Sequence, residues 1–230
     1  SGGHVTNPSL LALPYDTIRD FTPVATVSIS QYTLVVHPSL PVNSLQEFIA
    51  LAKSKPGQLN YGAMGTGGLQ NLASELFDIM TGTKMQRIPY KGSAQILPDL
   101  ISGITQVAFM KPLNVRGQIK SGQLKALAIS GETRLSALPQ VPTFAEAGLP
   151  GFSATNWYWI FGPAGIPKPI LDKLSSEIAK ILAMPDIREK FNAQGEEPLI
   201  STPDQFAALI KAEIAKYAKI IKTANIKAEK

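Results

Sequence analysis

The sequence predicts an α/β protein with a mainly parallel sheet, and three observations support this fold class. Segments typical of strands and of helices alternate from about residue 34 to residue 130, and parallel strands need such helices as crossovers. A glycine-rich turn at 62–68 joins one strand to the following helix. Two long extended segments, at 24–36 and 152–161, bracket the alternating region. A chain that crosses twice between two lobes has this arrangement, so we expect two lobes with two crossing strands.

The first elements follow from turn and capping signals. Residues 1–20 contain two proline turns and predict a loop region. The extended segment at 24–36 ends in a His-Pro pair. Asn43 or Ser44 then caps a helix that reaches about Lys53, because its apolar residues recur at helical spacing.

The later elements follow from apolar spacing, with Gly and Pro residues between them. In order, we expect a strand at 59–63, a helix at 69–81, a strand at 85–88, a turn at 89–92, a helix capped by Ser93 and ended by Gly103, a strand at 105–110, a short helix at 114–121, a strand at 124–130, a Pro-rich connection at 131–150, the second extended segment, and helices at 170–183, 185–193 and 203–224.

Composition excludes several classes of function. The chain has 230 residues, a net charge of +5 and no cysteine, so thiol catalysis, disulfides and thiolate metal sites are excluded. His4 and His37 are isolated, and we predict no metal site. Because no nucleophile–base pair or nucleotide-binding loop occurs, we predict neither an enzyme nor a bound cofactor. The excess positive charge is typical of a solvated surface or of a protein that steers an anionic ligand, and nucleic-acid binding is not expected.

The glycine-rich turn is the first candidate site. A helix that begins at Leu69 points unpaired N–H groups and the positive end of its dipole at the turn, which suits an anion. The alternative is a plain turn between a strand and a helix. The candidate ligand contacts in this segment are Met64, Gly65, Thr66, Gly67, Gly68 and Gln70.

Four further residues are candidates for lining the same site. Gln31 lies in the first extended segment, where polar groups in an apolar strand need partners. Met110 and Lys111 follow a strand, and Lys111 is either a solvated lysine or a partner for a second carboxylate. Asn156 lies in the second extended segment, and its amide can both donate and accept hydrogen bonds.

Short motifs along the chain occur in an order that is typical of one family. They are Leu13-Pro14-Tyr15-Asp16, Asp20-Phe21-Thr22-Pro23-Val24, the segment 61–72, Ile88-Pro89-Tyr90-Lys91-Gly92, the segment 122–128, the segment 138–143 with Glu146-Ala147-Gly148, and Trp157 with the segment 162–167. With this ordered set, which spans nearly the whole chain, the sequence resembles the solute-binding receptors of tripartite tricarboxylate transporters, the Bug-type or TctC-type periplasmic proteins.

The resemblance implies a type II periplasmic-binding-protein fold, in which two α/β lobes close around a small organic carboxylate. Lobe 1 would comprise residues 1–33 plus 158–230, and lobe 2 residues 34–157. In this family two loops grip the carboxylate, and the loop of lobe 2 corresponds here to residues 63–70. The ligand stays open among mono- and dicarboxylates, amino acids and aromatic acids.

The resemblance also bears on partners and location. It implies delivery of the ligand to membrane permease subunits, and a periplasmic mature form whose signal peptide is not in this chain. Family members begin with a strand, a Pro-Gly-Gly-type loop and a second βα unit, and this sequence starts after them. We therefore expect an incomplete lobe 1, either truncated or rebuilt, whose exposed sheet edge and apolar surface favour self-association.

The predicted function is that of an extracytoplasmic receptor for a small carboxylate. The alternative is an effector-sensing module of a transcription regulator with the same fold, which would need a fused DNA-binding domain. An enzyme that uses the glycine-rich turn as an oxyanion or phosphate cradle is a third hypothesis, and the missing nucleophile argues against it.

Overall fold

The computed structural model describes residues 2–228, and the chain forms two compact units. Unit 1 contains residues 2–30 and 156–228, and unit 2 contains residues 31–155. The predicted lobe boundaries fall after residues 33 and 157 instead. Which residues move together as lobes stays a prediction.

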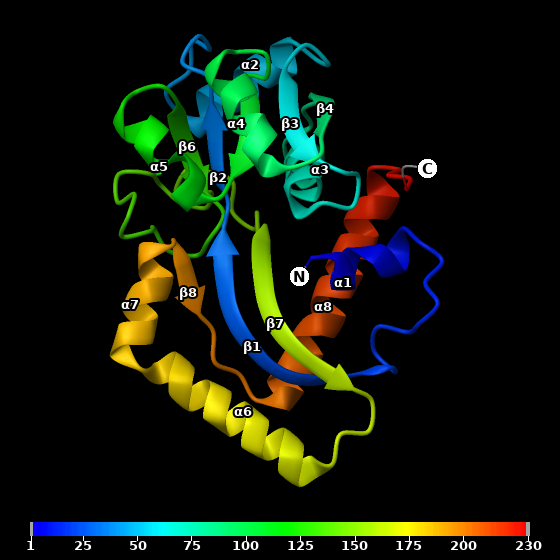
Figure 1. The fold of residues 1–230 in the computed structure, drawn as a ribbon. Coiled ribbons are helices and arrows are strands. Elements are labelled where there is room, and N and C mark those ends of the chain that lie inside the picture. Colours follow the sequence, from blue (N-terminus) through cyan, green and yellow to red (C-terminus); the bar gives the residue numbers. More distant parts are fainter. Residues whose placement is uncertain (1, 229–230) are drawn as a thin grey trace. The chain divides into compact units, whose positions relative to one another are not determined.

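The chain passes between the units at the ends of two strands. It leaves unit 1 at the end of β1 (Phe21–Gln31) and returns at the start of β7 (Thr155–Pro163), as Figure 1 shows. These strands correspond to the two extended segments that were predicted to cross between lobes.

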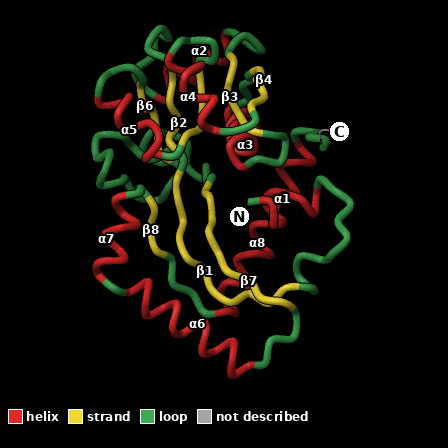
Figure 2. The backbone as a smooth tube through the Cα atoms, viewed as in Figure 1, coloured by secondary structure: helices red, strands yellow, loops and turns green. Residues whose placement is uncertain are grey.

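Unit 2 is built on a five-stranded sheet with the strand order β4-β3-β5-β2-β6. Its strands are β2 (Thr33–Val36), β3 (Asn60–Met64), β4 (Gln86–Tyr90), β5 (Val107–Met110) and β6 (Lys125–Ile129). β3 is parallel to β4 and β5, whereas β2 is antiparallel to both β5 and β6. The predicted mainly parallel sheet is therefore confirmed, with β2 as its reversed strand. β2 follows β1 almost directly and enters the sheet at the edge where the parallel strands end (Figure 2).

Helices connect the strands of unit 2. They are α2 (Leu45–Ser54), α3 (Leu69–Thr81), α4 (Ser93–Ile101) and α5 (Pro112–Lys120). Local signals set their ends: the Ser44 hydroxyl accepts a hydrogen bond from the Glu47 N–H at 3.2 Å, and Gly82 ends α3 with a φ of 66°.

Three local predictions in this unit need correction. Ser93 is the first residue of α4 and not its cap, because the extended residue Gly92 occupies the N-cap position. The turn expected at 89–92 is shorter, since β4 continues to Tyr90 in register with β3. The helix expected from residue 114 begins at Pro112, because proline suits the first turn of a helix.

Four buried phenylalanines form a cluster in the core of unit 2. Phe77 comes from α3 and Phe109 from β5, while Phe144 and Phe152 come from the irregular segment between β6 and β7. The ring centroids of Phe144 and Phe152 lie 4.0 Å apart, and Phe109 stacks on them at 6.1 and 5.7 Å. The Pro-rich connection is therefore part of the core and not only a linker.

Unit 1 is built on a three-stranded sheet with the order β7-β1-β8, in which β8 (Glu196–Pro198) is antiparallel to β1. Its later helices are α6 (Lys168–Ala183), α7 (Pro185–Ala193) and α8 (Pro203–Thr223), as predicted. The prediction of a loop over residues 1–20 is wrong in part, because α1 (Gly3–Thr6) and the 3-10 helix η1 (Asn7–Ser9) lie there. β8 was also missed, since three residues carry no pattern of their own.

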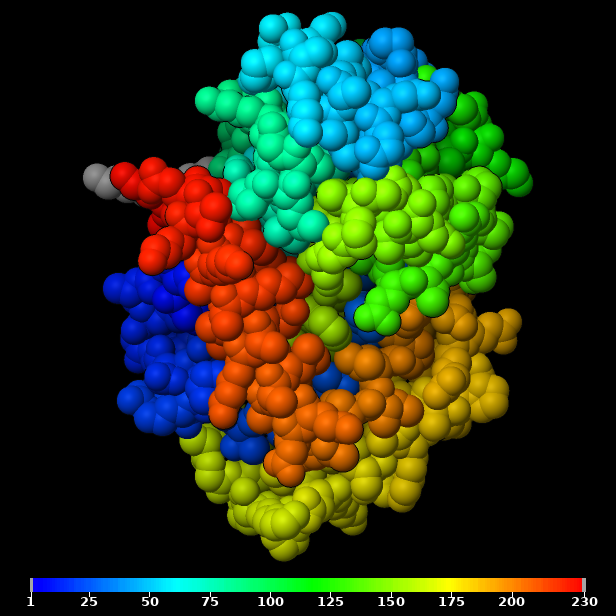
Figure 3. All heavy atoms as spheres, turned by 180° about the vertical axis from the view of Figure 1, so that it is seen from behind, coloured from blue at the N-terminus to red at the C-terminus, as the bar shows by residue number. Residues whose placement is uncertain are grey.

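The surface of unit 1 carries exposed apolar side chains. On α6 the side chains of Ile170, Leu174 and Ile181 are 54%, 44% and 50% exposed, and their spacing places them on one face of the helix. Leu182 is the buried residue of this helix. Figure 3 shows another face of unit 1, which is formed largely by α8 in orange to red.

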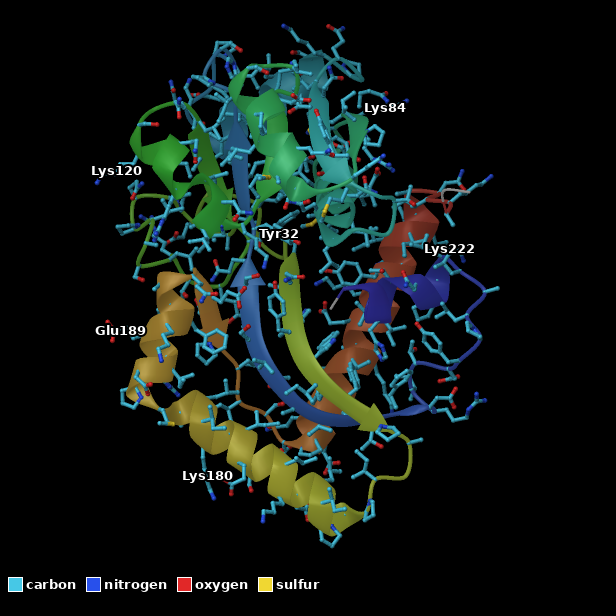
Figure 4. The ribbon with its side chains drawn as sticks, in the orientation of Figure 1. Tyr32, Lys84, Lys120, Lys180, Glu189 and Lys222 are labelled. Atoms are coloured by element: carbon cyan, nitrogen blue, oxygen red, sulfur yellow. The ribbon has the colours of Figure 1, made fainter. Side chains whose placement is uncertain are left out.

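The excess positive charge lies in part on solvated surface. Lys84, Lys120, Lys180 and Lys222 are exposed, and in Figure 4 their side chains point away from the backbone into solvent. Exposed lysines are expected both for spare surface charge and for charge that steers an anionic ligand, so the two interpretations stay open.

Candidate ligand-binding site

The predicted site residues of unit 2 lie at one edge of its sheet. β3 ends at Met64 and β5 ends at Met110, and these two strands run in the same direction. Since β2 is reversed, its first residue, Thr33, stands opposite Met110, so that Gln31 approaches the same edge from the other side. Ligands in α/β folds bind outside the carboxyl ends of the strands, where this edge lies.

The turn after β3 leads into the uncapped start of α3. The Gly68 N–H donates a hydrogen bond to the Gly65 carbonyl oxygen at 2.8 Å and closes the turn. Gly68 is the N-cap of α3, no side chain caps it, and the first turn of the helix contains no acidic residue. The first N–H groups of a helix lack partners within the helix, and its dipole is positive at this end. The local geometry is therefore that of an anion seat.

A buried hydrogen-bond network connects this turn to β3 and α3. The Asn71 side-chain amide donates to the Thr66 carbonyl oxygen at 3.0 Å. The Tyr61 hydroxyl lies 2.9 Å from both the Asn71 amide oxygen and a Glu75 carboxyl oxygen. Because Tyr61 and Asn71 are buried, the network links β3, the turn and α3 into one rigid piece.

Gln31 lies directly over Gly131, the second residue after β6. A side chain at Gly131 would overlap the Gln31 amide group, so this position has to be glycine for Gln31 to lie where it does. Gly131 is absent from the predicted site, and its place just after a strand was the only signal for it. Gln31 itself is 5% exposed.

Ser130 forms hydrogen bonds to both segments that connect the units, at Tyr32 and at Ala154. Its hydroxyl accepts a hydrogen bond from the Tyr32 N–H at 2.8 Å and donates to the Ala154 carbonyl oxygen. The Ser130 N–H in turn donates to the Tyr32 carbonyl oxygen at 2.9 Å. Figure 4 labels Tyr32 where the chain passes from β1 to β2. Ser130 follows the strand β6 and was not among the predicted ligand contacts.

The remaining candidates are placed less centrally. Lys111 is half-buried at the N-cap of α5, directly after β5. Asn156 lies in β7 and belongs to unit 1, so it is not part of the cluster in unit 2. Within residues 2–228, no three His, Cys, Asp or Glu side chains come together as a metal-binding group.

Two carboxyl groups of α3, those of Glu75 and Asp78, have raised pKa values. Burial raises the pKa of the Glu75 carboxyl above its ordinary value of 4.5, and the neighbouring Asp78 raises it further, while the Tyr61 hydroxyl and Arg87 act in the opposite direction. Burial likewise raises the pKa of Tyr61. A hydroxyl has one proton, so Tyr61 cannot donate to Asn71 and Glu75 at once. When Glu75 is protonated, it donates to the Tyr61 oxygen and leaves the Tyr61 proton for Asn71.

We expect Glu75→Gln to remove part of the pH dependence of stability. The folded state holds the Glu75 proton more tightly than the unfolded state does, so the free energy of unfolding falls as the pH rises from about 4.5 through the folded pKa. A glutamine amide donates at every pH, and this fall should shrink. Urea unfolding followed by circular dichroism between pH 4 and pH 8 measures it.

The control for this experiment is Glu132→Gln, because Glu132 is exposed in a loop. A smaller slope should remain in Glu75→Gln, since burial also raises the pKa of Asp78. An unchanged slope in Glu75→Gln would contradict the proton-sharing arrangement.

Comparison with known proteins places the chain among transport receptors. Residues 2–226 match the family described as Tripartite tricarboxylate transporter family receptor. Protein BugT from Bordetella pertussis (strain Tohama I) is 35% identical over 216 residues, which cover 94% of this chain and 66% of BugT.

Among the helices of residues 2–228, none has the length and apolar character needed to cross a membrane.

Solved structures of carboxylate-bound proteins are also similar to this chain. The structure of R. palustris Rpa4515 with adipate has a TM-score of 0.86 and 34% identity, and the match covers 98% of this chain and 76% of that one. MatC (Rpa3494) from Rhodopseudomonas palustris with bound malate has a TM-score of 0.79 and 28% identity, with coverage of 96% and 76%.

The fold and the relatives define the class of this protein. The fold is of the periplasmic-binding-protein type II, as the resemblance implied, and the relatives are solute-binding receptors and not enzymes. The chain belongs to the tripartite tricarboxylate transporter receptor family. It spans slightly less than two thirds of the length of the curated relatives named first, 66% of BugT and 62% of a relative from Pseudomonas sp. (strain P51). The alternative of an effector-sensing module gains no support from these likenesses.

Proposed function

We propose that this protein captures a small organic carboxylate at the start of α3 and presents it to a membrane permease of the tripartite tricarboxylate type. The observation that carries the proposal is the uncapped N-terminus of α3 behind a glycine turn that Asn71 holds in place. A carboxylate accepts hydrogen bonds from backbone N–H groups and is stabilised by the positive end of the helix dipole. The ligand contacts are then Met64 to Gly68 and Gln70.

The ligand-bound relatives support this class of ligand. The solved structures of Rpa4515 and MatC are named as complexes with adipate and with malate, which are both dicarboxylates. In this chain Gln31, Met110 and Lys111 would line the same edge, and Lys111 would pair with a second carboxylate. Asn156, on β7, is a further proposed ligand contact. The proposed location is the periplasm, because related solved structures are those of a periplasmic transporter and of the periplasmic binding protein BugD.

Titration calorimetry with a panel of mono- and dicarboxylates tests the proposal. We expect at least one carboxylate to bind, and its primary amide analogue to bind much more weakly, because the seat recognises the negative charge. Gly131→Ala should weaken binding about tenfold, since it displaces the Gln31 amide.

Gly117→Ala is the matched control for that variant. Gly117 lies within α5, and an added Cβ there meets nothing within 4 Å. Binding by this control should equal that of the wild type. Failure of every carboxylate to bind the wild-type protein would refute the proposed function.

We also propose that the chain self-associates through unit 1. β7 is an edge strand, and Ile170, Leu174 and Ile181 are exposed apolar side chains on one face of α6. Sedimentation velocity should show the average mass rising with protein concentration. Ile181→Glu should return the protein to a monomer, whereas Lys173→Glu, which changes an exposed polar position of the same helix, should not. A wild-type monomer at all concentrations would contradict this proposal.

A further inference from the structure

Gln70 holds a buried acceptor that no described residue satisfies. Gln70 is the second residue of α3, next to the anion seat, and is 3% exposed. Its amide nitrogen donates to the Phe109 carbonyl oxygen at 3.0 Å and lies 3.7 Å from the Met110 sulfur. Its amide oxygen is buried and has no hydrogen-bond partner among the described residues.

The orientation of this amide is fixed by its neighbour. The Phe109 carbonyl oxygen is an acceptor, so the group that faces it has to be the nitrogen. Turning the amide over would place two oxygens against each other and leave the nitrogen unused. The unpartnered atom is therefore the oxygen, which accepts hydrogen bonds and cannot donate them.

An ionised carboxylate cannot satisfy this oxygen. Both groups are acceptors, and a buried acceptor without a partner costs about 1–3 kcal/mol. Thr33, which stands opposite Met110 in the sheet, also has a buried hydroxyl that finds no partner within residues 2–228. Unused polar atoms thus occur on β2 and on α3 at this end of β5, and the one on Gln70 requires a donor.

We propose that Gln70 determines specificity by accepting a hydrogen bond from a hydroxyl or ammonium group that the ligand carries close to its bound carboxylate. The preferred ligands are then hydroxy or amino acids, and the corresponding plain acids bind more weakly. This inference rests on the proposed function, because it assumes a carboxylate at the start of α3. A hydroxyl or ammonium group is about as large as a water molecule, which is the size of group that satisfies a single buried acceptor.

Calorimetry with matched pairs of acids tests the inference. Each pair differs only by a donor beside one carboxylate: malate and succinate, 2-hydroxyglutarate and glutarate, 2-aminoadipate and adipate, lactate and propionate. For the wild-type protein we expect the donor-bearing member of the best-binding pair to bind at least about tenfold more tightly. Gln70→Met should bring that ratio close to one, chiefly by weakening the donor-bearing acid.

The ratio separates recognition from a structural effect. If Gln70 only supported the fold, Gln70→Met would weaken both members of a pair equally and leave the ratio unchanged. Gln46→Met is the matched control, because the Gln46 amide also donates to a backbone carbonyl, that of Ala147 at 2.9 Å, but on the exposed surface. This control should keep the wild-type ratio.

The outcomes distinguish the two proposals. If the wild-type protein binds carboxylates but prefers the plain acids or shows no preference, the inference about Gln70 is wrong and the proposed function stands. An unchanged preference in Gln70→Met also overturns the inference. If no carboxylate binds, the proposed function fails and the inference fails with it. If Gln70→Met does not fold, wild-type ratios close to or below one would still overturn the inference.

Discussion

Replacing Gly68 by valine should weaken carboxylate binding by about 10- to 100-fold and leave the protein folded. A Cβ atom at this position would lie 3.1 Å from the Gly65 carbonyl oxygen and 3.2 Å from that of Met64, and neither backbone atom can move without reshaping the turn. A hydrogen bond to a charged group contributes about 1.5–3 kcal/mol, so misplacing even one donor at the start of α3 has this effect. Calorimetry with the best-binding carboxylate measures the affinity, and circular dichroism checks the fold.

The chain offers a closely matched control in Gly92. This glycine is the N-cap of α4 and is extended, and a Cβ atom there would meet nothing within 4 Å. Gly92→Val should therefore bind the carboxylate as the wild-type protein does. If Gly68→Val and Gly92→Val bound the carboxylate with equal affinity, the glycine turn would not be part of the binding site.

Replacing Phe144 by alanine should lower the free energy of unfolding by about 3–5 kcal/mol. Phe144 is buried and touches three other rings of the cluster, with centroid distances of 4.0 Å to Phe152, 6.1 Å to Phe109 and 6.3 Å to Phe77. Removing its ring leaves a cavity that α3, β5 and the segment after β6 cannot close. Urea unfolding followed by circular dichroism measures the change.

Phe191→Ala provides the comparison for this variant. Phe191 lies half-buried on α7, so the same change removes fewer contacts and should cost less than half as much. If Phe144→Ala were no more destabilising than Phe191→Ala, the segment between β6 and β7 would not be part of the core. Ligand binding by Phe144→Ala, measured below its unfolding transition, should persist because the seat itself is unchanged.

The elements around the anion seat could be predicted because their signals are local. Glycines allow the turn after β3, and the apolar spacing from Leu69 is helical. The observed helix begins at Leu69 and ends before Gly82, as the sequence predicts. Errors occur where the signals are weak, as at Ser93 and in the three-residue strand β8.

The arrangement of side chains at the site could not be predicted in the same way. Asn71, Ser130 and Gly131 were not among the predicted site residues, although they hold the turn, the crossing segments and Gln31 in place. Each of these contacts depends on the strand order, or on a hydrogen-bond partner that sequence spacing does not identify. The reversal of β2, which brings Gln31 to the carboxyl edge, likewise has no signal within the strand itself.

The sequence by itself determined the α/β class, the order of the main elements, the family and the glycine turn that opens α3. The class, the elements and the turn depend on backbone preferences, apolar periodicity and a helix dipole, which all act within a few residues, whereas the family follows from the order of short motifs along the chain. Only the tertiary structure decided that the Gln70 amide nitrogen bonds to Phe109, 39 residues further along the chain, and that no donor in the described part of the chain reaches its oxygen. The pairing of polar groups in a core depends on which distant segments the fold brings together, and for this reason ligand specificity is a property of the tertiary structure.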